Sequence, residues 1–408
     1  MNAPVPAAEA LAPRRGGAPL RVLHVIPSVS AYHGGPTKAL ETMEQALSAA
    51  GIAVTTATTD DAGPGLRLGG DRQPDRVGRA SRVYFRKWLE FYKVAPGIVP
   101  WLWRHVRDFD VVHIHALFSF TSTAAALVAY WRGVPYVVRP LGSLAAYGVT
   151  RRRARLKRLS IAAIEGGILR RAAAVHFTAQ AEWDEAKSLR LPFRGIVIPL
   201  GAAAEKPGDA QHLLRDHPQL RDRHVILYLS RLDPKKNVEG LLAAFAALEP
   251  ADAALLIAGS GDPAYVKSLV ALAQSLGIAS RVVWLGHVEG AEKRAALALA
   301  DVFVLPSFSE NFGIAAAEAL LAGLPSVLGR GVAIAKDVEA AGGALVVDPD
   351  SGAIARALAR LLGDEALRRE IGHRGRQFAE RSYSVEAMAS RLASLYRSLA
   401  GAGLTVQR

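Results

Sequence analysis

The chain has 408 residues, 50% of them apolar, so it is too long for one ordinary hydrophobic core and suits two domains of about 150 to 200 residues each. It contains no cysteine, which excludes disulfides and thiolate-bound metals. Its 50 Lys and Arg residues outnumber 37 Asp and Glu residues, and the resulting net charge of +13 should attract polyanions or anionic lipid.

The N-terminal part of the chain is predicted to form one α/β domain. Residues 1–19 lack the apolar segment of a signal peptide and are typical of a disordered leader. Residues 20–200 then alternate short β-branched runs with helical segments such as 37–51, which favours a doubly wound sheet of parallel strands with crossover helices. The predicted strands are 21–27, 53–59, 83–85, 111–115, 135–140, 173–178 and 195–200.

A second α/β domain is predicted after a break in this pattern. Residues 201–222 show little periodicity and are interpreted as an interdomain linker. A second alternating series occupies residues 223–382, with predicted strands at 225–230, 253–259, 281–286, 302–306, 325–329 and 344–348. Open α/β sheets bind ligands at the carboxyl ends of their strands, so motifs that directly follow a strand are the first candidates for function.

The most informative motif is PSFSENFGIAAAEALLAGLPSV at 306–327. An apolar strand leads into a loop and an Ala/Leu-rich helix, with Glu310 before the helix and Glu318 inside it. Gly313 permits close backbone approach, and the unpaired first amides of the helix favour an anionic phosphate group. The two carboxylates, roughly 12 Å apart, would accept hydrogen bonds from hydroxyls on either side. This layout predicts a site for sugar, diphosphate and ribose, the parts of a nucleotide sugar.

The motif SRLDPKKN at 230–237 predicts the positive charge for such a diphosphate. Arg231 directly follows a strand and Lys236 precedes the next helix, so one loop would supply a forked contact and a point charge. Lys235 is the weaker candidate of the adjacent lysines. A solvated charged loop is the alternative interpretation, which the position at the sheet edge disfavours.

Three further turns after strands are weaker candidates. Gly34 and Gly35 in YHGGPTKAL would let a phosphate or sugar approach bare backbone. Gly259 in AGSGD and His287 after the next strand are candidates for a nucleobase pocket. An ordinary structural turn explains each of the three equally well.

Histidines and acidic triplets raise the question of a metal. His113 and His115 are two apart on one predicted strand and therefore share a face, with His115 nearer the carboxyl end as a candidate sugar contact. No third ligand with suitable spacing accompanies them, so no metal is expected. The triplets DFD at 108–110 and DPD at 348–350 match the loose pattern of metal-dependent sugar transferases, but their positions favour structural roles.

These motifs resemble those of the retaining family 4 (group 1) glycosyltransferases of the GT-B fold. The likeness covers roughly residues 20–390 and rests on SRLDPKKN, AGSGD and SENFGIAAAEALLAGLPSV in the family's order, with the glycine loop YHGGPTKAL as a looser match. The resemblance implies two Rossmann-like domains facing a cleft, a nucleotide-sugar donor such as a UDP- or GDP-hexose held mainly by the second domain, and no other cofactor. The acceptor would lie on the first domain.

Carried over by position, the resemblance implies roles for individual residues. It assigns the diphosphate to Arg231 and Lys236, the ribose to Glu318, the donor sugar to Glu310 and His115, and the sugar's phosphate to Gly35, and it places Asn311, Phe312 and Gly313 in the donor site. Retention implies that the departing phosphate takes the acceptor proton, without a protein nucleophile. Arg231, Lys236 and the helix N-terminus would then be the catalytic apparatus, because they stabilise charge on the diphosphate. We expect catalysis without a metal.

The ends of the likeness are less uniform. The family's last helix often crosses back to the first domain, and Met388, Leu392 and Leu395 in the segment 383–408 form an apolar stripe suited to that contact. Leu200 stands where the family commonly has Asn. The segment RPLGSL at 139–144 resembles a subset associated with surface polysaccharide assembly, so a glycan or polyprenyl-linked glycan acceptor is expected.

Basic and aromatic segments predict a location at a membrane surface. The block RRRARLKR at 151–158 opens an amphipathic segment, and Trp88, Phe91, Trp101 and Trp103 are interleaved with cations. A packed helix and buried core aromatics explain the same residues equally well. We expect a cytoplasmic protein, peripheral at the inner face of the membrane.

Two other classes of protein stay open at the level of sequence. A nucleic-acid-binding protein would explain the positive charge, but no zinc or RNA-recognition signature supports it, and no nucleic-acid partner is expected. A sugar phosphorylase or nucleotide-sugar isomerase would share the two-domain architecture.

Overall fold

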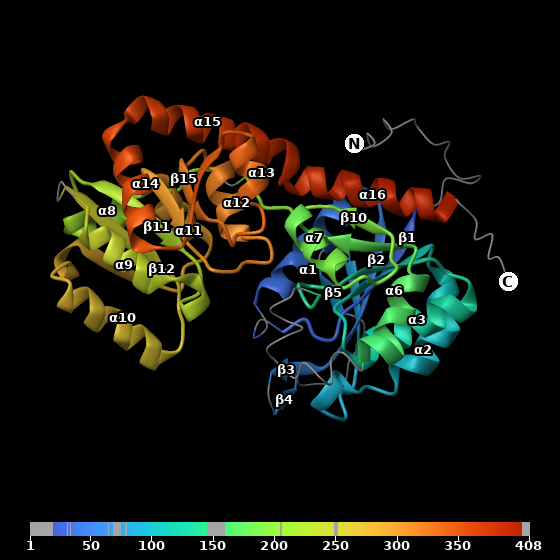
Figure 1. The fold of residues 1–408 in the computed structure, drawn as a ribbon. Helices are drawn as coiled ribbons and strands as arrows, with labels where there is room; N and C mark the ends of the chain where they lie inside the picture. The colour runs from blue at the N-terminus through green and yellow to red at the C-terminus, as the bar shows by residue number, and fades with distance from the viewer. Residues whose placement is uncertain are drawn as a thin grey trace.

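The computed structural model describes residues 19–401 except 31, 33, 64, 68–74, 78–79, 145–159, 205 and 249–251, and it contains two α/β domains side by side (Figure 1). The basic block at 151–158 and nearly all of the leader lie outside the described residues. None of the described helices is both long enough and apolar enough to span a bilayer.

The first domain is built on an eight-stranded sheet in the order β10-β9-β8-β7-β1-β2-β6-β5. Its strands are β1 (Arg21–Val25), β2 (Ala53–Thr59), β5 (Asp75–Val77), β6 (Ala80–Phe85), β7 (Val111–His115), β8 (Tyr136–Arg139), β9 (Ala174–Phe177) and β10 (Gly195–Val197). Neighbouring strands are parallel except β5 with β6, so the predicted doubly wound sheet is confirmed, with an antiparallel strand at one edge. A short hairpin of β3 (Asp61–Gly63) and β4 (Leu66–Arg67) stands beside it.

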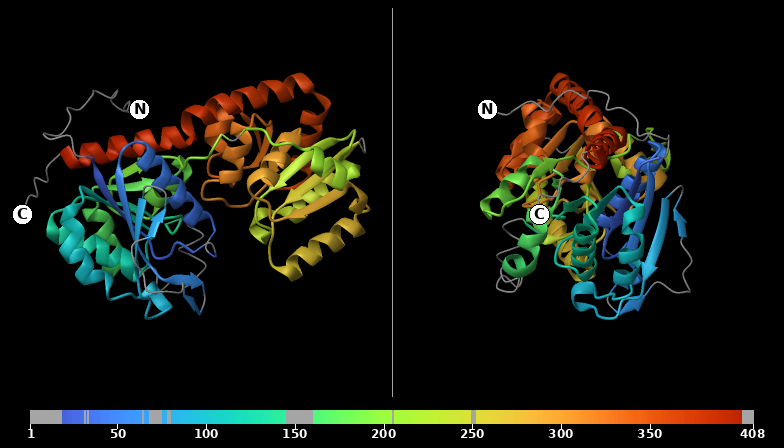
Figure 2. Two further views of the ribbon diagram at one scale, coloured as in Figure 1. Left: turned by 180° about the vertical axis from the view of Figure 1, so that it is seen from behind. Right: turned by 90° about the vertical axis from the view of Figure 1, so that its right-hand side faces the viewer.

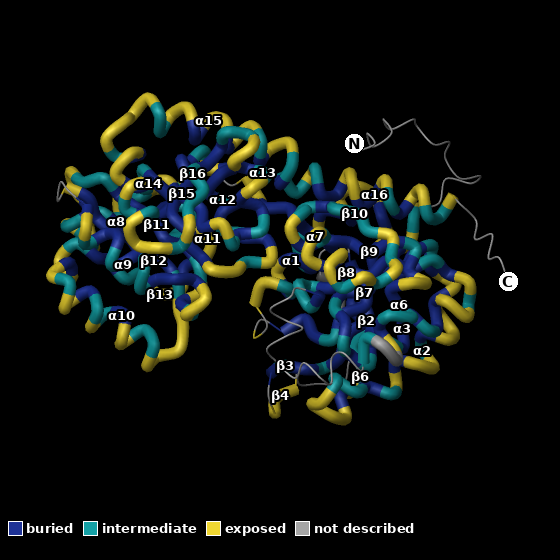
Figure 3. The backbone as a smooth tube through the Cα atoms, viewed as in Figure 1, coloured by how far each residue is buried: buried dark blue, intermediate teal, exposed yellow. Residues whose placement is uncertain are grey.

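Helices cover this sheet on both faces, and the strands lie buried between them (Figure 3). The described helices are α1 (Gly35–Ala49), α2 (Ile98–His105), α3 (Phe120–Arg132), α6 (Gly166–Arg171) and α7 (Gln180–Ser188), with the short turns η2 (Phe91–Lys93), η3 (Val106–Asp108) and η4 (Ile161–Glu165). Because both faces are covered, β7 and β8 are buried along their whole length, as their continuous apolar sequence predicts.

The second domain has a six-stranded parallel sheet in the order β13-β12-β11-β14-β15-β16. Its strands are β11 (His224–Leu229), β12 (Ala253–Ala258), β13 (Val282–Gly286), β14 (Val302–Leu305), β15 (Ser326–Gly329) and β16 (Ala344–Val347). Its helices are η6 (Pro234–Lys236), α9 (Val238–Ala246), α10 (Pro263–Ser275), η7 (Ala279–Arg281), α11 (Gly290–Leu299), α12 (Ile314–Leu321), α13 (Ala335–Ala340), α14 (Ser351–Gly363) and α15 (Glu365–Ser382).

The segment 201–222 is more ordered than its weak periodicity indicates. It contains α8 (Gln211–Asp216) and the turn η5 (Pro218–Leu220). Leu213 and Leu220 are buried in a core cluster shared with the second domain's strands, so only the start of this segment is a bare connection.

Two chain crossings join the domains side by side. The chain leaves the first domain at Ala202 and returns to it at Tyr383. The two crossings are joined by a hydrogen bond, in which the Ala202 amide donates to the Tyr383 carbonyl at 2.8 Å. After Tyr383, α16 (Val385–Gly401) lies along the first domain, as both ribbon views show (Figures 1 and 2). It packs on α1 and β7. The hydroxyl of Tyr396 in α16 lies 2.6 Å from His113 Nδ1 in β7.

Candidate functional site

The loop after β11 presents two cations in different ways. Asp233 caps η6 by accepting a hydrogen bond from the Lys235 amide at 3.1 Å. This turn directs Lys236 inward, where the residue is 4% exposed, whereas Arg231 stays exposed. The Tyr228 hydroxyl donates to the Arg231 carbonyl at 3.0 Å and fixes the loop on its strand. Both cations therefore lie at the carboxyl edge of the second sheet.

Lys236 is ion-paired with Glu310, which follows β14, the neighbour of β11 in the sheet. Burial lowers the pKa of the Lys236 ammonium from its ordinary value, and the Glu310 carboxylate opposes this effect. The backbone of Glu310 is fixed as well: its amide donates to the Gly331 carbonyl at 2.9 Å, and its carbonyl accepts from the Ala333 amide at 3.2 Å. The ion pair joins the cation predicted for the diphosphate to the carboxylate predicted for the sugar.

The helix α12 follows directly, and Gly313 is required at its start. Gly313 has φ 94°, and a Cβ at this position would lie 2.9 Å from Val332 Cγ1, so a larger residue would be both strained and crowded. No described side chain caps this end of α12, so its first amides can serve an anion. Glu318, on the next turn, accepts from Lys293 Nζ at 2.8 Å.

A cavity of about 270 Å³ lies beside Glu318. It lies between the chain at Ala203, Ala204, Lys206 and Pro207 and the helices α11, α12 and α15, and its lining includes Glu318 and its partner Lys293. Lys236 and Glu310 do not line it, so Glu318 is the predicted site residue that this cavity shares.

Of the weaker candidates after strands, Gly259 is closely packed and His287 is exposed. A Cβ at Gly259 would lie 1.8 Å from the Ser230 carbonyl oxygen, so this glycine lets the loop after β12 pack against the loop that carries Arg231. His287 follows β13 with a side chain that is 68% exposed and lies 3.2 Å from Glu289. Gly259 thus has a structural role that would suffice to explain it.

In the first domain, the amino end of α1 is open. Gly34 precedes α1 with φ 63°, and a Cβ at Gly34 or Gly35 would have no atom of the described residues within 4 Å. Neither glycine is required by packing against the part of the chain that the structure describes. The φ of Gly34 and the exposed start of α1 leave backbone that a ligand can approach.

The donor-side motif touches the first domain through Asn311. A Cβ at Gly142 would lie 2.4 Å from Asn311 Nδ2, and the Thr178 hydroxyl lies 3.4 Å from the Asn311 carbonyl oxygen. Glu182 organises this contact, because it accepts from the amides of Gly142 at 3.0 Å and Thr178 at 2.8 Å. The sequence singled out the segment around Gly142 but gave no signal for Thr178 or Glu182.

Phe312, by contrast, is buried in the protein interior. It is 3% exposed and packs edge-on against Tyr383, with ring centroids 5.4 Å apart. Its position in the motif therefore serves the junction between the domains. The acidic triplets are also structural: Asp110 accepts from the Arg21 amide at 2.9 Å, and Asp350 caps α14.

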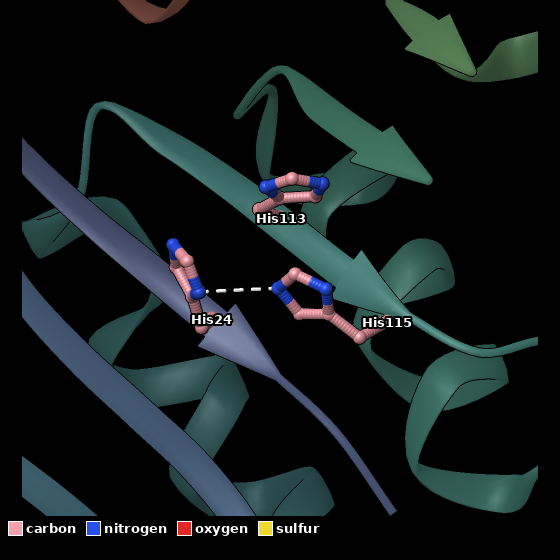
Figure 4. A group of neighbouring side chains, drawn as sticks. All are labelled: His24, His113 and His115. Atoms are coloured by element: carbon pink, nitrogen blue, oxygen red, sulfur yellow. Dashed lines mark hydrogen bonds between the residues drawn. The ribbon is translucent and has the colours of Figure 1, made fainter. Parts of the chain in front are cut away.

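His115 lies at the carboxyl end of β7 but is fully buried. Its Nε2 is 3.1 Å from Nδ1 of His24 on the neighbouring strand β1, and His113 lies beside both (Figure 4). His24 is the third imidazole that sequence spacing did not reveal, because the register of β1 with β7 brings it there. The three rings have the number and proximity of a metal site, so their hydrogen bonds decide what they can do.

Each acceptor nitrogen in this group already has a donor. The Ile198 carbonyl can only accept, so His176 donates to it from Nε2 at 2.7 Å and leaves its Nδ1 to accept from His113. His113 then accepts at Nδ1 from Tyr396. Arg139 faces Nδ1 of His115 at 3.5 Å, which leaves Nε2 of His115 to donate to His24. No lone pair remains for a cation, and a guanidinium stands beside the rings.

Burial also keeps these rings neutral. It lowers the pKa of His24 and of His176 to about 3, with the positive charge of Arg139 adding to the effect. Burial is also the main reason why the pKa values of His113 and His115 are lowered well below their ordinary value. The group therefore forms a neutral polar layer between the sheet and α16.

Comparisons with known proteins cover nearly the whole chain. The family model "Glycosyl transferase 4-like domain" matches residues 34–201, and "Glycosyl transferases group 1" matches residues 211–378. A phosphatidyl-myo-inositol mannosyltransferase of Mycolicibacterium smegmatis is 30% identical over 360 residues, which are 81% of this chain and 78% of that protein. Its namesake in Mycobacterium leprae is 34% identical over 219 residues, 52% of this chain and 56% of that protein. The chain thus spans about half the length of the first curated relatives it matches.

Solved structures share the fold. Sucrose-phosphate synthase from Thermosynechococcus elongatus superposes with a TM-score of 0.75 at 22% identity, over 94% of this chain and 100% of that chain. Anabaena Alr3699/HepE, in complex with UDP and glucose, superposes with a TM-score of 0.70 at 18% identity, over 93% of this chain and 100% of that chain.

Proposed function

The chain belongs to the group 1 glycosyltransferases and has the GT-B fold, and on this premise we propose that it transfers a hexose from a nucleoside diphosphate to a hydroxyl of a glycan or polyprenyl-linked glycan. The observation that supports the proposal is that Arg231, Lys236 and the uncapped start of α12 follow neighbouring strands at the carboxyl edge of the second sheet. Glu310 and Glu318 flank this positive region, as hydroxyl acceptors for sugar and ribose.

The proposed reaction retains the configuration at the anomeric carbon. The acceptor oxygen attacks from the face where the diphosphate departs, the bond from the anomeric carbon to the phosphate oxygen breaks, and that phosphate takes the acceptor proton. Arg231, Lys236 and the amides of α12 stabilise the charge that develops on the leaving diphosphate. No protein nucleophile takes part, in keeping with the full burial of His115.

The proposed reaction needs no metal ion. The cations of the second domain supply the positive charge that a divalent ion supplies to diphosphates elsewhere. The described histidine group is a poor alternative, because its acceptor nitrogens are occupied and Arg139 lies beside His115. Turnover is therefore expected to persist in EDTA.

The proposed setting is surface polysaccharide synthesis at the cytoplasmic face of a membrane. The net charge of +13 favours anionic headgroups, and the relatives from Mycolicibacterium smegmatis and Mycobacterium leprae are named as transferases to a phospholipid. A lipid-linked acceptor would explain both features.

The test is turnover of UDP-, GDP- and ADP-hexoses with a polyprenyl-linked glycan in EDTA, followed by NMR of the new linkage. Release of nucleoside diphosphate with a retained anomeric configuration is expected. An inverted linkage or abolition by EDTA would contradict the mechanism. Sugar phosphate release that needs phosphate but no nucleotide would identify a phosphorylase. Nucleotide-sugar conversion without diphosphate release would identify an isomerase. A salt-dependent gel shift with an oligonucleotide would favour a nucleic-acid-binding protein.

A further inference from the structure

The loop of residues 87–94 follows β6 and contains η2. Its large apolar side chains are exposed and one of its lysines is buried, which is the reverse of the usual arrangement in a loop. Trp88, Leu89 and Phe91 are 66%, 58% and 67% exposed, whereas Lys87 is 5% exposed. In a surface loop, the lysine normally faces water and the large apolar side chains face the core. This loop buries Lys87 and exposes its large apolar side chains, while Glu90 is 52% exposed and ion-paired with Lys87 and Lys93.

The polar side chains of this loop are held by carboxylates. Lys87 is ion-paired with the fully buried Asp61, and its amide donates to Asp60 Oδ1 at 2.7 Å. Lys93 Nζ reaches the second oxygen of Asp61 at 3.0 Å. Asp61 therefore anchors both ends of the loop, and its charge holds both lysines inward.

The loop is also fixed in shape. The Trp88 amide donates to the Val94 carbonyl at 2.8 Å, and the Val94 amide donates to the Leu89 carbonyl at 3.2 Å. Tyr92 and Lys93 have φ of 59° and 48°, a strained conformation that persists only where the surroundings enforce it. The Tyr92 hydroxyl donates to Glu165 Oε1 at 2.9 Å. The apolar side chains are thus held outward and do not fold back onto the protein.

The loop lies at the edge of the first domain where the carboxyl ends of the strands lie. It follows β6, and Asp61 of β3 ties it to the hairpin labelled β3 and β4 at the lower end of that domain in Figure 1. Glu165, which binds Tyr92, also accepts from the Phe118 amide at 3.1 Å in the loop after β7. Ile164, adjacent to Glu165 in sequence, is 40% exposed.

We propose that the 87–94 loop inserts Trp88, Leu89 and Phe91 into the hydrocarbon boundary of a lipid bilayer. Trp and Phe are suited to this depth, and the net charge of +13 attracts the anionic headgroups above it. A second copy of the chain is a poorer occupant, because three side chains fall far short of the roughly 800 Å² that each partner buries in a stable interface. The insertion would bring the first domain's strand ends, where the proposed function places the acceptor, down to a lipid-linked substrate.

The structure separates this loop from the other tryptophans of the aromatic segments. Trp101 packs against Phe85, with ring centroids 5.6 Å apart. Trp103 and Trp131 are 46% and 65% exposed near the ends of α2 and α3, where Arg132 lies 5.1 Å from the Trp103 ring. Those helix ends are at the opposite edge of the sheet, so Trp103 and Trp131 provide a matched control.

The test is flotation of the full chain with vesicles of phosphatidylcholine mixed with phosphatidylglycerol. The variant Trp88→Gln/Leu89→Gln/Phe91→Gln is expected to partition at least about tenfold more weakly than the parent, since burial of one such side chain is worth about that factor. The control Trp103→Gln/Trp131→Gln should bind like the parent. Brominated lipids should quench tryptophan fluorescence in the parent, and Trp88→Phe should keep binding but lose the quenching.

The flotation measurement is independent of the transferase proposal, because no nucleotide-sugar donor is present in it. Thermal shifts by nucleotide sugars should be equal in the parent and both multiple variants, which also shows that they are folded. Parent-like partitioning of the loop variant, equal loss in both variants, or no vesicle binding by the parent would overturn the inference. So would a parental dimer that the loop substitutions convert to monomer, because that result would assign the surface to a second copy.

Discussion

Lys236 and Glu310 form an ion pair at the carboxyl edge of the second sheet, between the loops after β11 and β14. The two side chains are 5% and 17% exposed, so water solvates both charges poorly. Each charge is therefore stabilised by its partner. In the proposed complex, the donor diphosphate takes Lys236 and the donor sugar takes Glu310. The protein thus holds its binding groups in place before the donor arrives, and the donor replaces one ion pair with two charge-assisted contacts.

Replacement of Lys236 tests this exchange. Lys236→Ala should lower kcat/KM by the equivalent of about 2.7 to 4 kcal/mol, because one donor to the developing charge is lost. Lys235→Ala is the matched control, since Lys235 is adjacent but exposed, and it should retain nearly parental kinetics. Steady-state rates with a fixed acceptor measure both. Equal losses in the two variants would mean that general loop charge, and not Lys236, serves the diphosphate.

The two glutamates should affect different steps. Glu318→Ala should weaken nucleotide binding by about 1.5 to 3 kcal/mol, the usual worth of a hydrogen bond to a charged group, and reduce the thermal shift given by the nucleoside diphosphate alone. Glu310→Ala should leave that shift nearly parental and mainly slow transfer, because its proposed partner is the sugar. The measurements are thermal shift and kcat with the same donor. Parental binding and turnover in both variants would show that the site is misplaced.

Gly142 tests the contact between the domains. Gly142→Ala places a Cβ 2.4 Å from Asn311 Nδ2 and should slow transfer, while binding of the nucleoside diphosphate to the second domain stays near parental. Gly133→Ala is a close control, since both glycines have φ 71° but at Gly133 no described atom lies within 4 Å of the added carbon. Each substitution should cost about 1 kcal/mol of stability from the left-handed backbone. Equal transfer rates in the two variants would dismiss this contact.

The buried histidines predict a dependence of stability on pH. The pKa values of His24 and His176 are about 3 in the folded protein because of burial and Arg139, whereas an unfolded histidine has a pKa of about 6.5. The unfolded chain therefore binds more protons below pH 6.5, and the free energy of unfolding falls as the pH falls, by about 1.4 kcal/mol per pH unit for each ring. Urea unfolding between about pH 5 and pH 7 measures this slope.

A variant makes this measurement specific. His24→Gln removes one of the buried rings, so its slope should be smaller than the parental slope by about one proton. The comparison cancels the contribution of carboxylates, which both proteins share. A parental slope near zero, or identical slopes in parent and variant, would contradict neutral burial of His24.

The strands were predictable because parallel strands covered on both faces are continuous apolar runs. All the predicted strands are present, whereas β3, β4 and β5 are two or three residues long and were missed. The order of Glu310, Gly313 and Glu318 around the start of α12 was also readable, because it is local in sequence.

The rest of the site depends on register and on the approach of the two domains. His24 and His113 are 89 residues apart and meet because β1 pairs with β7. Gly142 and Asn311 meet only where the first domain touches the second. The burial of His115 and Phe312 is likewise set by the helices and rings that cover them, which no local pattern shows.

Calorimetric titration with UDP-, GDP- and ADP-hexoses in EDTA tests the central claim most directly. The parent should bind at least one of these donors saturably with one site per chain, and the variant Arg231→Ala/Lys236→Ala should bind that donor too weakly to detect, because the diphosphate loses both of its side-chain cations. Failure of all three donors to bind, or equal affinity in the parent and the variant, would contradict the account.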